Sequence, residues 1–382
     1  MMIFVYIAAL VLLLIYALLL QYYFRSWKNM QAEPVQPALT SSPHTKVSII
    51  VPARNEEKDI AACIHSILEQ RYPQALMECI IVDDHSEDNT ARIVKQFDSP
   101  ILRLISLRDQ GISPSTNSYK KKALEAGIAA AGGELIITTD ADCTMEQDWL
   151  NHVVAHYEQT GDQFIAAPVK INHRGGWLSV FQVLDFTSLQ GITAASVHRG
   201  FHSMCNGANL AYTKKAFYSV EGFRDIDRKA SGDDMLLMHK IARQYPGKVG
   251  YLRNKSAIVT TNPQPTLRSF FQQRIRWASK AQDYKDKNVF RVLLLVYTIN
   301  LLLLIILLTA FFSISQALIA LGFLLLKTLV EWSFMYSVSS FYHQQNLMVW
   351  FPLFQPLHIL YTVIAGSFGQ FGQYEWKGRR VS

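Results

Sequence analysis

The chain has 382 residues, half of them hydrophobic, and a formal net charge of +7 at pH 7, which allows one large domain or two. Its mean hydropathy of +0.10 is high for a soluble enzyme, and the apolar excess lies at the two ends. The sequence has no basic surface interleaved with aromatic residues, which argues against a nucleic-acid partner. We therefore interpret the basic excess as attraction to anionic membrane lipids.

The N-terminal end carries an uncharged apolar run at 2–24, long enough to cross a bilayer, which needs roughly 20 residues. A signal peptide is the competing interpretation. However, no cationic residue precedes the run and no small-residue cleavage site follows it, so we expect a retained anchor. Apolar runs at 292–312 and 315–336 predict two further spans, and 347–369 is a candidate fourth.

Basic residues flank the globular middle on both sides. Arg25 and Lys28 follow the first span, and a cluster of lysines and arginines between Arg268 and Arg291 precedes the second. By the positive-inside rule, this pattern predicts a cytoplasmic globular part in a multi-pass protein of the cell membrane. The same rule prefers the basic tail at 376–380 inside, whereas three C-terminal spans would put it outside, so the sequence leaves the number of spans open.

Composition shifts along the chain predict six segments. Pro, Ser and Gln after the first span are typical of a linker, and the helical pattern at 266–282 is amphipathic, with Leu267, Phe271, Ile275 and Ala278 on one apolar stripe. The predicted segments are an N-terminal transmembrane anchor (1–26), a linker (27–45), a globular α/β domain (46–264), an amphipathic interfacial helix (265–288), a C-terminal transmembrane region (289–371) and a tail (372–382).

The globular segment alternates strand and helix patterns. In chain order, the expected elements are a strand (46–55), a helix (56–70), a strand, acidic turn and helix (78–97), a strand (101–107), a helix (120–133) and a strand (134–143). Such alternation predicts a mostly parallel sheet covered on both faces. The second half is mixed, with a strand at 164–171, a strand and helix at 206–217, and a helix at 231–245.

Polar residues follow each of the first strands. In open sheets of this kind, ligands bind beyond the carboxyl ends of the strands, where these side chains would gather. Two aspartates one residue apart suit a divalent cation that arrives with phosphate oxygens, although acids there could also cap a helix. The residues concerned are Arg54, Asn55 and Glu56, then Asp83 and Asp84, then Asp140 and Asp142.

Three more stretches could carry chemistry. Asp233 and Asp234 lie at a predicted helix start, where the dipole keeps a carboxylate ionised, so either could act as a base or simply cap the helix. The segment "QRIRW" at 273–277 offers arginines for a diphosphate and a tryptophan for stacking, or else a basic membrane-facing face. The lysines at 120–122 suggest an anionic partner or a solvated charge cluster.

These motifs appear in a recognisable order: "VSIIVPARNE", "VDDHSED", "KKKAL", "TTDADC", "NGANLAY", "GDD" and "QRIRW". In this combination the chain resembles the family 2 glycosyltransferases over about 45–280. Within that family it resembles the membrane-bound branch that contains ceramide glucosyltransferases and the hyaluronan, chitin and cellulose synthases. The resemblance implies an α/β, GT-A type (Rossmann-like, mostly parallel sheet) cytoplasmic domain with N-terminal and C-terminal transmembrane helices.

The resemblance also implies roles for individual residues. Asp234 would be the catalytic base, with Asp233 beside it where the family often has Glu-Asp, and Asp142 and Asp140 would hold Mg²⁺ or Mn²⁺. The sugar and acceptor region would be shaped by Asn206, Gly207 and Asn209. The nucleotide-sugar donor would be bound by Pro52, Arg54, Asn55, Glu56, Asp83, Asp84, Lys120, Asp140, Gln273, Arg276 and Trp277.

The implied reaction is an inverting, metal-dependent transfer of a sugar from a nucleotide-diphosphate sugar, with UDP expected as the nucleotide. A lipid acceptor at the membrane surface is favoured over a growing glycan, because three or four spans are few for a polysaccharide channel. A catalytically inactive membrane scaffold is the remaining alternative. Lys327 and Glu331, four residues apart in the third span, are expected to pair across one helical turn, and a role in substrate passage is the sharper alternative.

Overall fold

The computed structural model describes residues 2–30, 44–112, 119–201, 204–227, 232–279, 287–369, 374–376 and 379–381, the last two ranges by their backbone only. Most of the predicted linker and part of the predicted tail therefore lie outside the described residues. The contacts divide the chain into two compact units. The helical unit comprises Met1–Asn29, His173–Ala195 and Pro263–Trp376, and the sheet unit comprises Met30–Asn172, Ser196–Asn262 and Lys377–Ser382.

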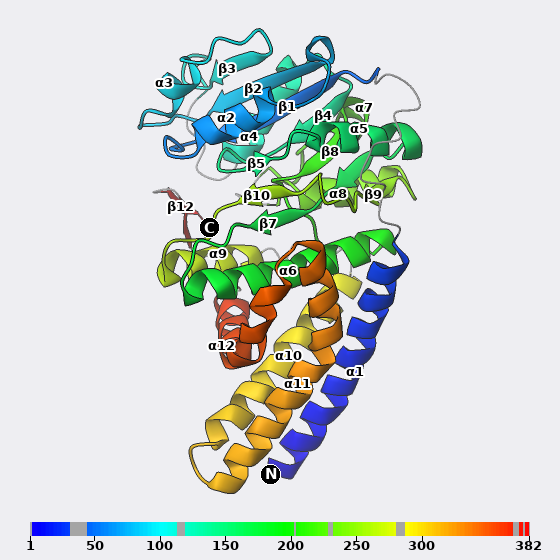
Figure 1. The fold of residues 1–382 in the computed structure, drawn as a ribbon, viewed down its shortest axis with the longest axis vertical. Helices are drawn as coiled ribbons and strands as arrows, with labels where there is room; N and C mark the ends of the chain where they lie inside the picture. Colours follow the sequence, from blue (N-terminus) through cyan, green and yellow to red (C-terminus); the bar gives the residue numbers. More distant parts are fainter. Residues whose placement is uncertain are drawn as a thin grey trace. The chain divides into compact units, whose positions relative to one another are not determined.

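The sheet unit is built on a seven-stranded sheet with the order β3-β2-β1-β4-β8-β6-β9 (Figure 1). The first four strands in that order are parallel, β8 is antiparallel to both of its neighbours, and β6 pairs with β9 in parallel. The predicted mostly parallel sheet is thus confirmed. The strands are β1 (Val47–Ala53), β2 (Met77–Asp83), β3 (Leu102–Ser106), β4 (Leu135–Thr138), β6 (Phe164–Ala166), β8 (Leu210–Thr213) and β9 (Val249–Tyr251).

The strand expected at 164–171 is wrong as a single element. It splits at Ala167 and Pro168 into β6 and β7 (Val169–Ile171), and β7 joins a second sheet of order β5-β10-β7. Proline has no backbone N–H with which to continue the hydrogen-bond ladder, so a break at this position is expected on physical grounds. The other strands of the second sheet are β5 (Thr144–Met145) and β10 (Val259–Thr261).

Helices of the sheet unit follow the strands as the alternation predicted. The helix after β3 packs closely on the sheet, since a Cβ at Gly127 would lie 2.5 Å from Ile50 Cγ2 and 3.1 Å from Val82 Cγ2. Only glycine lets the helix backbone approach β1 and β2 so closely. The helices are α2 (Ile60–Leu68), η1 (Gln74–Leu76), α3 (Thr90–Val94), α4 (Tyr119–Ala130), α5 (Trp149–Thr160), α7 (Lys214–Ser219) and α8 (Met235–Gln244).

In the helical unit, α1, α10 and α11 run side by side (Figure 1). Their shared core includes Leu13, Ile299, Leu303 and Phe323. In the part of the chain that the structure describes, four helical segments are long and apolar enough to cross a membrane: Met2–Asn29, Lys287–Thr309, Ile314–Phe341 and Gln345–Phe368. The elements are α1 (Met2–Asn29), α6 (Trp177–His198), α9 (Leu267–Ser279), α10 (Lys287–Thr309), α11 (Ile314–Phe341), η3 (Gln345–Trp350), α12 (Phe351–Phe368) and the short strand β11 (Tyr374–Trp376). The last strand, β12 (Arg379–Val381), falls within the residues of the sheet unit.

The amphipathic helix is α9, and its buried face differs from the stripe read from the sequence. Leu267 is 41% exposed, whereas Phe270 and Arg274 are the buried residues of the helix. Phe271 and Ile275 pack against an aromatic cluster that includes Phe181 of α6 and Tyr361 of α12. An arginine can lie on this face because its charge is paired there, as described below.

Candidate active site

The site residues of the sheet unit gather where β1, β2 and β4 end. Ala53 at the end of β1 pairs with Asp83 at the end of β2, and Pro52 pairs with Val82 one residue earlier. β1 also lies parallel to β4, which ends two residues before Asp140. The polar residues that follow these strands are therefore delivered to one edge of the sheet, as the alternating pattern predicted.

Arg54 and Asn55 tie the loop after β1 to the loop after β2. Arg54 is buried, and its Nη1 donates to the carbonyl oxygens of Asp84 (2.9 Å) and His85 (3.2 Å). Asn55 has a left-handed backbone (φ 52°), its N–H donates to Ser86 Oγ, and its side-chain oxygen accepts from the Glu87 N–H. These bonds hold the backbones of the two loops together at this edge of the sheet.

Glu56 begins the turn into α2. Its backbone N–H donates to Thr90 Oγ1 (2.8 Å), and its carbonyl accepts the N–H of Ile60. The hydrogen bond to Thr90 links the loop after β1 to the first residue of α3. Glu56 thus extends the connection made by Arg54 and Asn55.

Asp83 and Asp84 have different surroundings at the end of β2. Asp84 is 4% exposed, and its Oδ1 lies 3.0 Å from His85 Nδ1. Asp83 is 5% exposed, and its Oδ1 has no hydrogen-bond partner among the described residues. An unmet buried acceptor is costly, so Asp83 is positioned to accept an N–H from a ligand. The alternative that these acids cap α3 is not supported, because the N-cap of that helix is Asn89.

Lys120 joins two acidic motifs of the site. Its Nζ lies 2.7 Å from Asp140 Oδ1 and 3.3 Å from Asp233 Oδ2. Burial opposes the charged ammonium, but Asp140 and then Asp233 outweigh it, so the pKa of Lys120 is raised above its usual range. The lysine at the start of α4 is thus a fixed cation between carboxylates, which decides against the solvated charge cluster at this position.

Gly207 lies next to the same cluster, and its backbone carries no side chain there. A Cβ on this residue would lie 3.2 Å from Lys120 Nζ, 3.4 Å from Asp233 Oδ2 and 3.7 Å from Asp234 Cβ. Asp234 is the N-cap of α8, and its Oδ1 accepts the Met235 N–H (2.7 Å). The sequence left open whether the acids cap this helix, and in the structure one of them does so at the edge of the cluster.

Asp140 and Asp142 do not cap a helix. Helix α5 starts at Trp149 with Asp148 as its N-cap, and the short strand β5 lies between it and the two acids. Asp142 Oδ2 accepts from Thr261 Oγ1 (3.3 Å). Among the described residues, no group of three or more His, Cys, Asp or Glu side chains could hold a metal ion by itself. Two carboxylates fit Mg²⁺ or Mn²⁺ only when a phosphate-bearing ligand supplies the remaining oxygens.

The residues of "NGANL" separate into two groups. Asn206 lies next to Gly207, and its Oδ1 accepts the Ala208 N–H. Asn209 is 1% exposed, and its amide bonds Trp149 Nε1 (3.0 Å), the Pro168 oxygen (2.8 Å) and the Ala257 oxygen (2.9 Å). The structure therefore places Asn209 in the core, where its side chain holds the connection between the two sheets.

Comparison with known sequences decides the family. Residues 48–217 match the model of "Glycosyl transferase family 2", and residues 135–365 match that of "Glycosyl transferase family group 2". The second match covers more than half of the chain. The chain belongs to the family 2 glycosyltransferases.

Curated relatives of this glycosyltransferase chain are similar over part of their length. A probable glycosyltransferase of Bacillus subtilis, YdaM, is 25% identical over 275 residues, which are 70% of this chain and 63% of the relative. An N-acetylglucosaminyltransferase of Rhizobium meliloti is 28% identical over 282 residues, 69% of this chain and 63% of the relative. For the glycosyltransferase AglE of Haloferax volcanii the identity is 30% over 145 residues, 38% of this chain and 46% of the relative. The chain thus spans less than two thirds of each of these relatives.

A solved structure supports the GT-A fold expected from the family resemblance. The mannosyltransferase PcManGT from Pyrobaculum calidifontis, in complex with GDP-Man and Mn²⁺, matches with a TM-score of 0.59. The match covers 96% of this chain and 98% of that chain at 18% identity. At this level of identity the likeness establishes the fold alone.

The QxxRW motif of this family 2 chain lies on α9, in the helical unit. Gln273 Oε1 accepts from Arg274 Nη1 (3.0 Å), and the Arg274 guanidinium lies 4.2 Å from the centre of the Trp277 ring. Arg276 lies on the same helix and is partly exposed. Arg274, which falls between the motif positions, therefore contacts two of the three motif residues.

Sequence reasoning missed the partner of Arg274. Asp185 of α6 is 5% exposed, and its Oδ2 lies 2.7 Å from Arg274 Nη2, while its Oδ1 accepts the hydroxyl of Tyr361 in α12. The available signal was an isolated acid inside the apolar helix at 177–198, because a buried acid needs a partner. The predicted pair of Lys327 and Glu331 is confirmed at 2.6 Å.

Proposed function

We propose that the protein is an inverting, metal-dependent glycosyltransferase that transfers a sugar from a nucleotide-diphosphate sugar to a lipid acceptor at the cytoplasmic face of the cell membrane. The observation that carries this proposal is the cluster of Lys120, Asp140, Asp233 and Gly207 at the carboxyl ends of parallel strands. Carboxylates, a fixed cation and a glycine backbone without a side chain suit a site that binds a diphosphate and the hydroxyl that attacks the sugar.

Asp234 is the proposed general base. It lies beside Gly207 at the start of α8, where its Oδ1 accepts the Met235 N–H. A base must be ionised and within reach of the hydroxyl proton that it removes. Asp233 has a different assignment because it faces Lys120. Asp234 takes the proton while the acceptor oxygen attacks the anomeric carbon from the face opposite the nucleotide, which inverts the configuration.

The donor is held at the ends of β1, β2 and β4. Asp83, whose Oδ1 has no partner among the described residues, accepts an N–H of the base, and the hydrogen bonds of Arg54 and Asn55 keep the neighbouring loops in place. A UDP-sugar is the proposed donor. Lys120 carries its positive charge toward the diphosphate, and Arg276 and Trp277 of the QxxRW motif are proposed to complete the donor site.

Asp142 and Asp140 would hold a divalent cation together with the diphosphate. When bound, that cation neutralises the negative charge on the departing nucleotide. The Mn²⁺ in the complex of the structurally similar mannosyltransferase supports a divalent metal for this proposal.

The lipid acceptor is proposed from the helical unit. Four helical segments have the length and hydropathy of membrane spans. A similar chain, which is 25% identical over 190 residues, is named 4,4'-diaponeurosporenoate glycosyltransferase, from Staphylococcus aureus, and its name gives 4,4'-diaponeurosporenoate as the compound that it glycosylates. The basic residues on both flanks of the sheet unit favour the cytoplasmic side.

A transfer assay tests the proposal. Membranes that carry the protein, or its Asp234→Asn variant, are incubated with labelled nucleotide sugars and Mg²⁺ or Mn²⁺, and then extracted with organic solvent. Label that reaches the organic phase only with the unsubstituted protein supports a glycolipid enzyme and identifies the donor. Label in a polymer would instead indicate a polysaccharide synthase, and no transfer from any donor would favour the inactive scaffold.

A further inference from the structure

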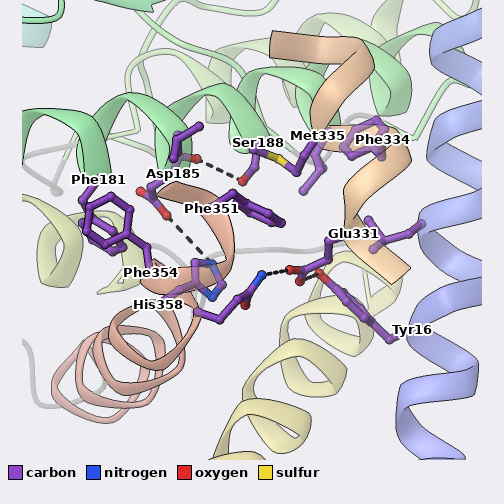
Figure 2. Close-up of a pocket in the computed structure, with 14 residues that line it drawn as sticks. Tyr16, Phe181, Asp185, Ser188, Glu331, Phe334, Met335, Phe351, Phe354 and His358 are labelled. Atoms are coloured by element: carbon purple, nitrogen blue, oxygen red, sulfur yellow. Dashed lines mark hydrogen bonds and ion pairs between the residues drawn. The ribbon is translucent and has the colours of Figure 1, made fainter. Parts of the chain in front are cut away.

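A cavity of the helical unit is lined by both polar and aromatic side chains. The polar ones are Tyr16, Asp185, Ser188, Glu331, Gln355 and His358, contributed by α1, α6, α11 and α12 (Figure 2). The aromatic ones include Phe181, Phe334 and Phe354. A cavity with both kinds of lining matches an amphiphile better than water or a purely apolar molecule.

The described residues that line the cavity include two carboxylates and no lysine or arginine. Asp185 and Glu331 line the cavity, whereas their cationic partners, Arg274 and Lys327, do not. Glu331 also accepts from Gln355 Nε2 (2.6 Å) and from the Tyr16 hydroxyl (2.7 Å). The negative charge of each carboxylate is therefore balanced by a cation that does not line the cavity. Among the described lining residues, no lysine or arginine is available to an occupant.

Two lining groups retain hydrogen-bonding capacity. Ser188 Oγ donates to the Asp185 backbone oxygen (3.0 Å), as Figure 2 shows. This bond leaves the lone pairs of the Ser188 hydroxyl available. His358 Nε2 lies 4.0 Å from Asp185, and its Nδ1 has no hydrogen-bond partner among the described residues. A hydroxyl or an amide on the occupant can satisfy both groups without bringing a charge.

We infer that this cavity is a binding site for the head group of an uncharged, hydroxyl-bearing lipid. A phosphate head group would be buried beside two carboxylates with no facing cation, and an uncompensated buried charge is strongly unfavourable. The cavity offers about 50 Å³, which is room for only a few atoms because one water needs roughly 10–15 Å³. It therefore accommodates the hydroxyl end of the lipid, and the acyl chains lie outside it.

The inference concerns binding alone and is tested without a sugar donor, so it can fail or succeed independently of the proposed transfer. The purified full chain in nanodiscs is labelled with a photoreactive diacylglycerol. Unlabelled diacylglycerol and phosphatidic acid with the same acyl chains then compete. We expect cross-links on peptides that contain Phe334, Met335 or Phe354. We also expect diacylglycerol to compete about tenfold better than phosphatidic acid, a difference of roughly 1.4 kcal/mol.

Substitutions at Ser188 test the location and the charge argument. Ser188→Phe fills the cavity and should reduce labelling about tenfold, or by roughly 1.4 kcal/mol. Leu329→Phe is the control on α11, because Leu329 is 71% exposed and does not line the cavity. Ser188→Arg adds a cation to the wall and should move the competition toward phosphatidic acid.

The inference is overturned if phosphatidic acid competes as well as diacylglycerol with the unsubstituted protein. It is also overturned if Ser188→Phe and Leu329→Phe label equally while both elute as folded protein. Should a Ser188 variant not fold, the head-group competition on the unsubstituted chain decides the question alone. Labelling that no unlabelled lipid can compete away would indicate general membrane proximity and would likewise overturn the inference.

Discussion

The ammonium of Lys120 lies 2.7 Å from Asp140, so the first carboxylate of the predicted metal motif is already paired with a cation of the protein. Asp233 lies 3.3 Å from the same nitrogen. One lysine therefore lies between two acids and offsets their mutual repulsion. Lys120 thus already supplies part of the positive charge that the proposed diphosphate site needs, and in that proposal a divalent cation would supply the rest.

Replacing Lys120 by methionine should disable the site. The variant leaves Asp140 and Asp233 uncompensated and removes a cation from the proposed diphosphate site. We expect kcat/KM for the donor to fall by roughly 10²-fold or more, as for loss of one electrostatic group in an active site. Lys122→Met is the matched control, because Lys122 is an exposed residue of the same helix. Equal losses in the two variants would contradict the assignment.

The pH dependence of this contribution has a definite sign. The pKa of Lys120 is raised above its ordinary value of 10.5, against the effect of burial, by Asp140 and Asp233. A group with a raised pKa stabilises the folded state fully below its unfolded pKa, and that stability is lost as pH rises through the folded pKa. The difference in melting temperature between the unsubstituted protein and Lys120→Met should therefore stay constant from about pH 7 to pH 9. A difference that shrinks within this window would contradict the ion pairing of Lys120 with Asp140 and Asp233.

The arrangement of the sheet edge could be predicted from the sequence because hydrophobic periodicity and the polar residues that end each strand are local features of the sequence. Alternating strands and helices fix parallel pairing, and polar residues directly after buried strands must then meet at one edge. The position of Lys120 against Asp140 and Asp233 depends on the packing of α4 and α8, which no local pattern encodes. Pro168 was a sequence signal for a break in the strand, because proline has no backbone N–H. The apolar residues before and after it nevertheless suggested one continuous strand.

The buried polar contacts of the helical unit were only partly predictable. Lys327 and Glu331 lie one helical turn apart, so their pairing follows from helix geometry. Gln355 joins the same pair from α12, and Asp185 pairs with Arg274 from another helix. These contacts depend on how separate helices pack, and the sequence fixes only that each buried polar group needs some partner.

Asp234 and Asp233 should respond differently to loss of charge. Asp234→Asn removes the proposed base and should lower kcat by roughly 10²- to 10⁴-fold. The helix should persist because asparagine is also a good N-cap. Asp233→Asn removes a partner of Lys120 and should mainly raise KM for the donor. Steady-state kinetics of both variants separate the two roles, and a larger kcat loss in Asp233→Asn would reverse the assignment.

Removal of divalent cations should abolish transfer. Asp142 contacts Thr261 in the structure, and no group of three or more His, Cys, Asp or Glu side chains among the described residues could hold a metal ion. The proposed metal would therefore depend on both the acids and the diphosphate. We expect Asp142→Asn to raise the Mn²⁺ concentration for half-maximal activity about tenfold, or roughly 1.4 kcal/mol. Asp148→Asn is the control because Asp148 caps α5 and pairs with the exposed Arg71. Full activity in the presence of a chelator would refute the metal requirement.

Asn209 should affect stability more than chemistry. Asn209→Ala removes its bonds to Trp149, Pro168 and Ala257, and each buried group left unpaired costs about 1–3 kcal/mol. We expect a lower melting temperature and a lower yield, with the activity per folded molecule largely retained. Asn206→Ala, which removes only a local turn bond, should melt near the unsubstituted protein. A well-folded but inactive Asn209→Ala would instead assign Asn209 a direct role.

Asp185 and Arg274 should behave as a buried charge pair that also positions the QxxRW motif. Their atoms lie 2.7 Å apart, and both side chains are almost fully buried. Removing one partner leaves an uncompensated charge, so Asp185→Leu or Arg274→Met alone should cost about 3–5 kcal/mol. The double variant should recover most of the thermal stability, because a buried ion pair can be replaced by apolar residues at little net cost.

Activity then separates packing from positioning. Arg274 donates a hydrogen bond to Gln273, and its guanidinium lies over the Trp277 ring. Methionine has no N–H donor and no charge, so it can make neither contact. The stable double variant should therefore keep a raised KM for the donor, while Arg274→Lys in the otherwise unchanged chain should restore only part of the binding, since lysine lacks the planar fork of arginine. Normal kinetics in the double variant would mean that the pair serves only to bury its own charges, and that α9 is positioned by its aromatic contacts with Phe181 and Tyr361.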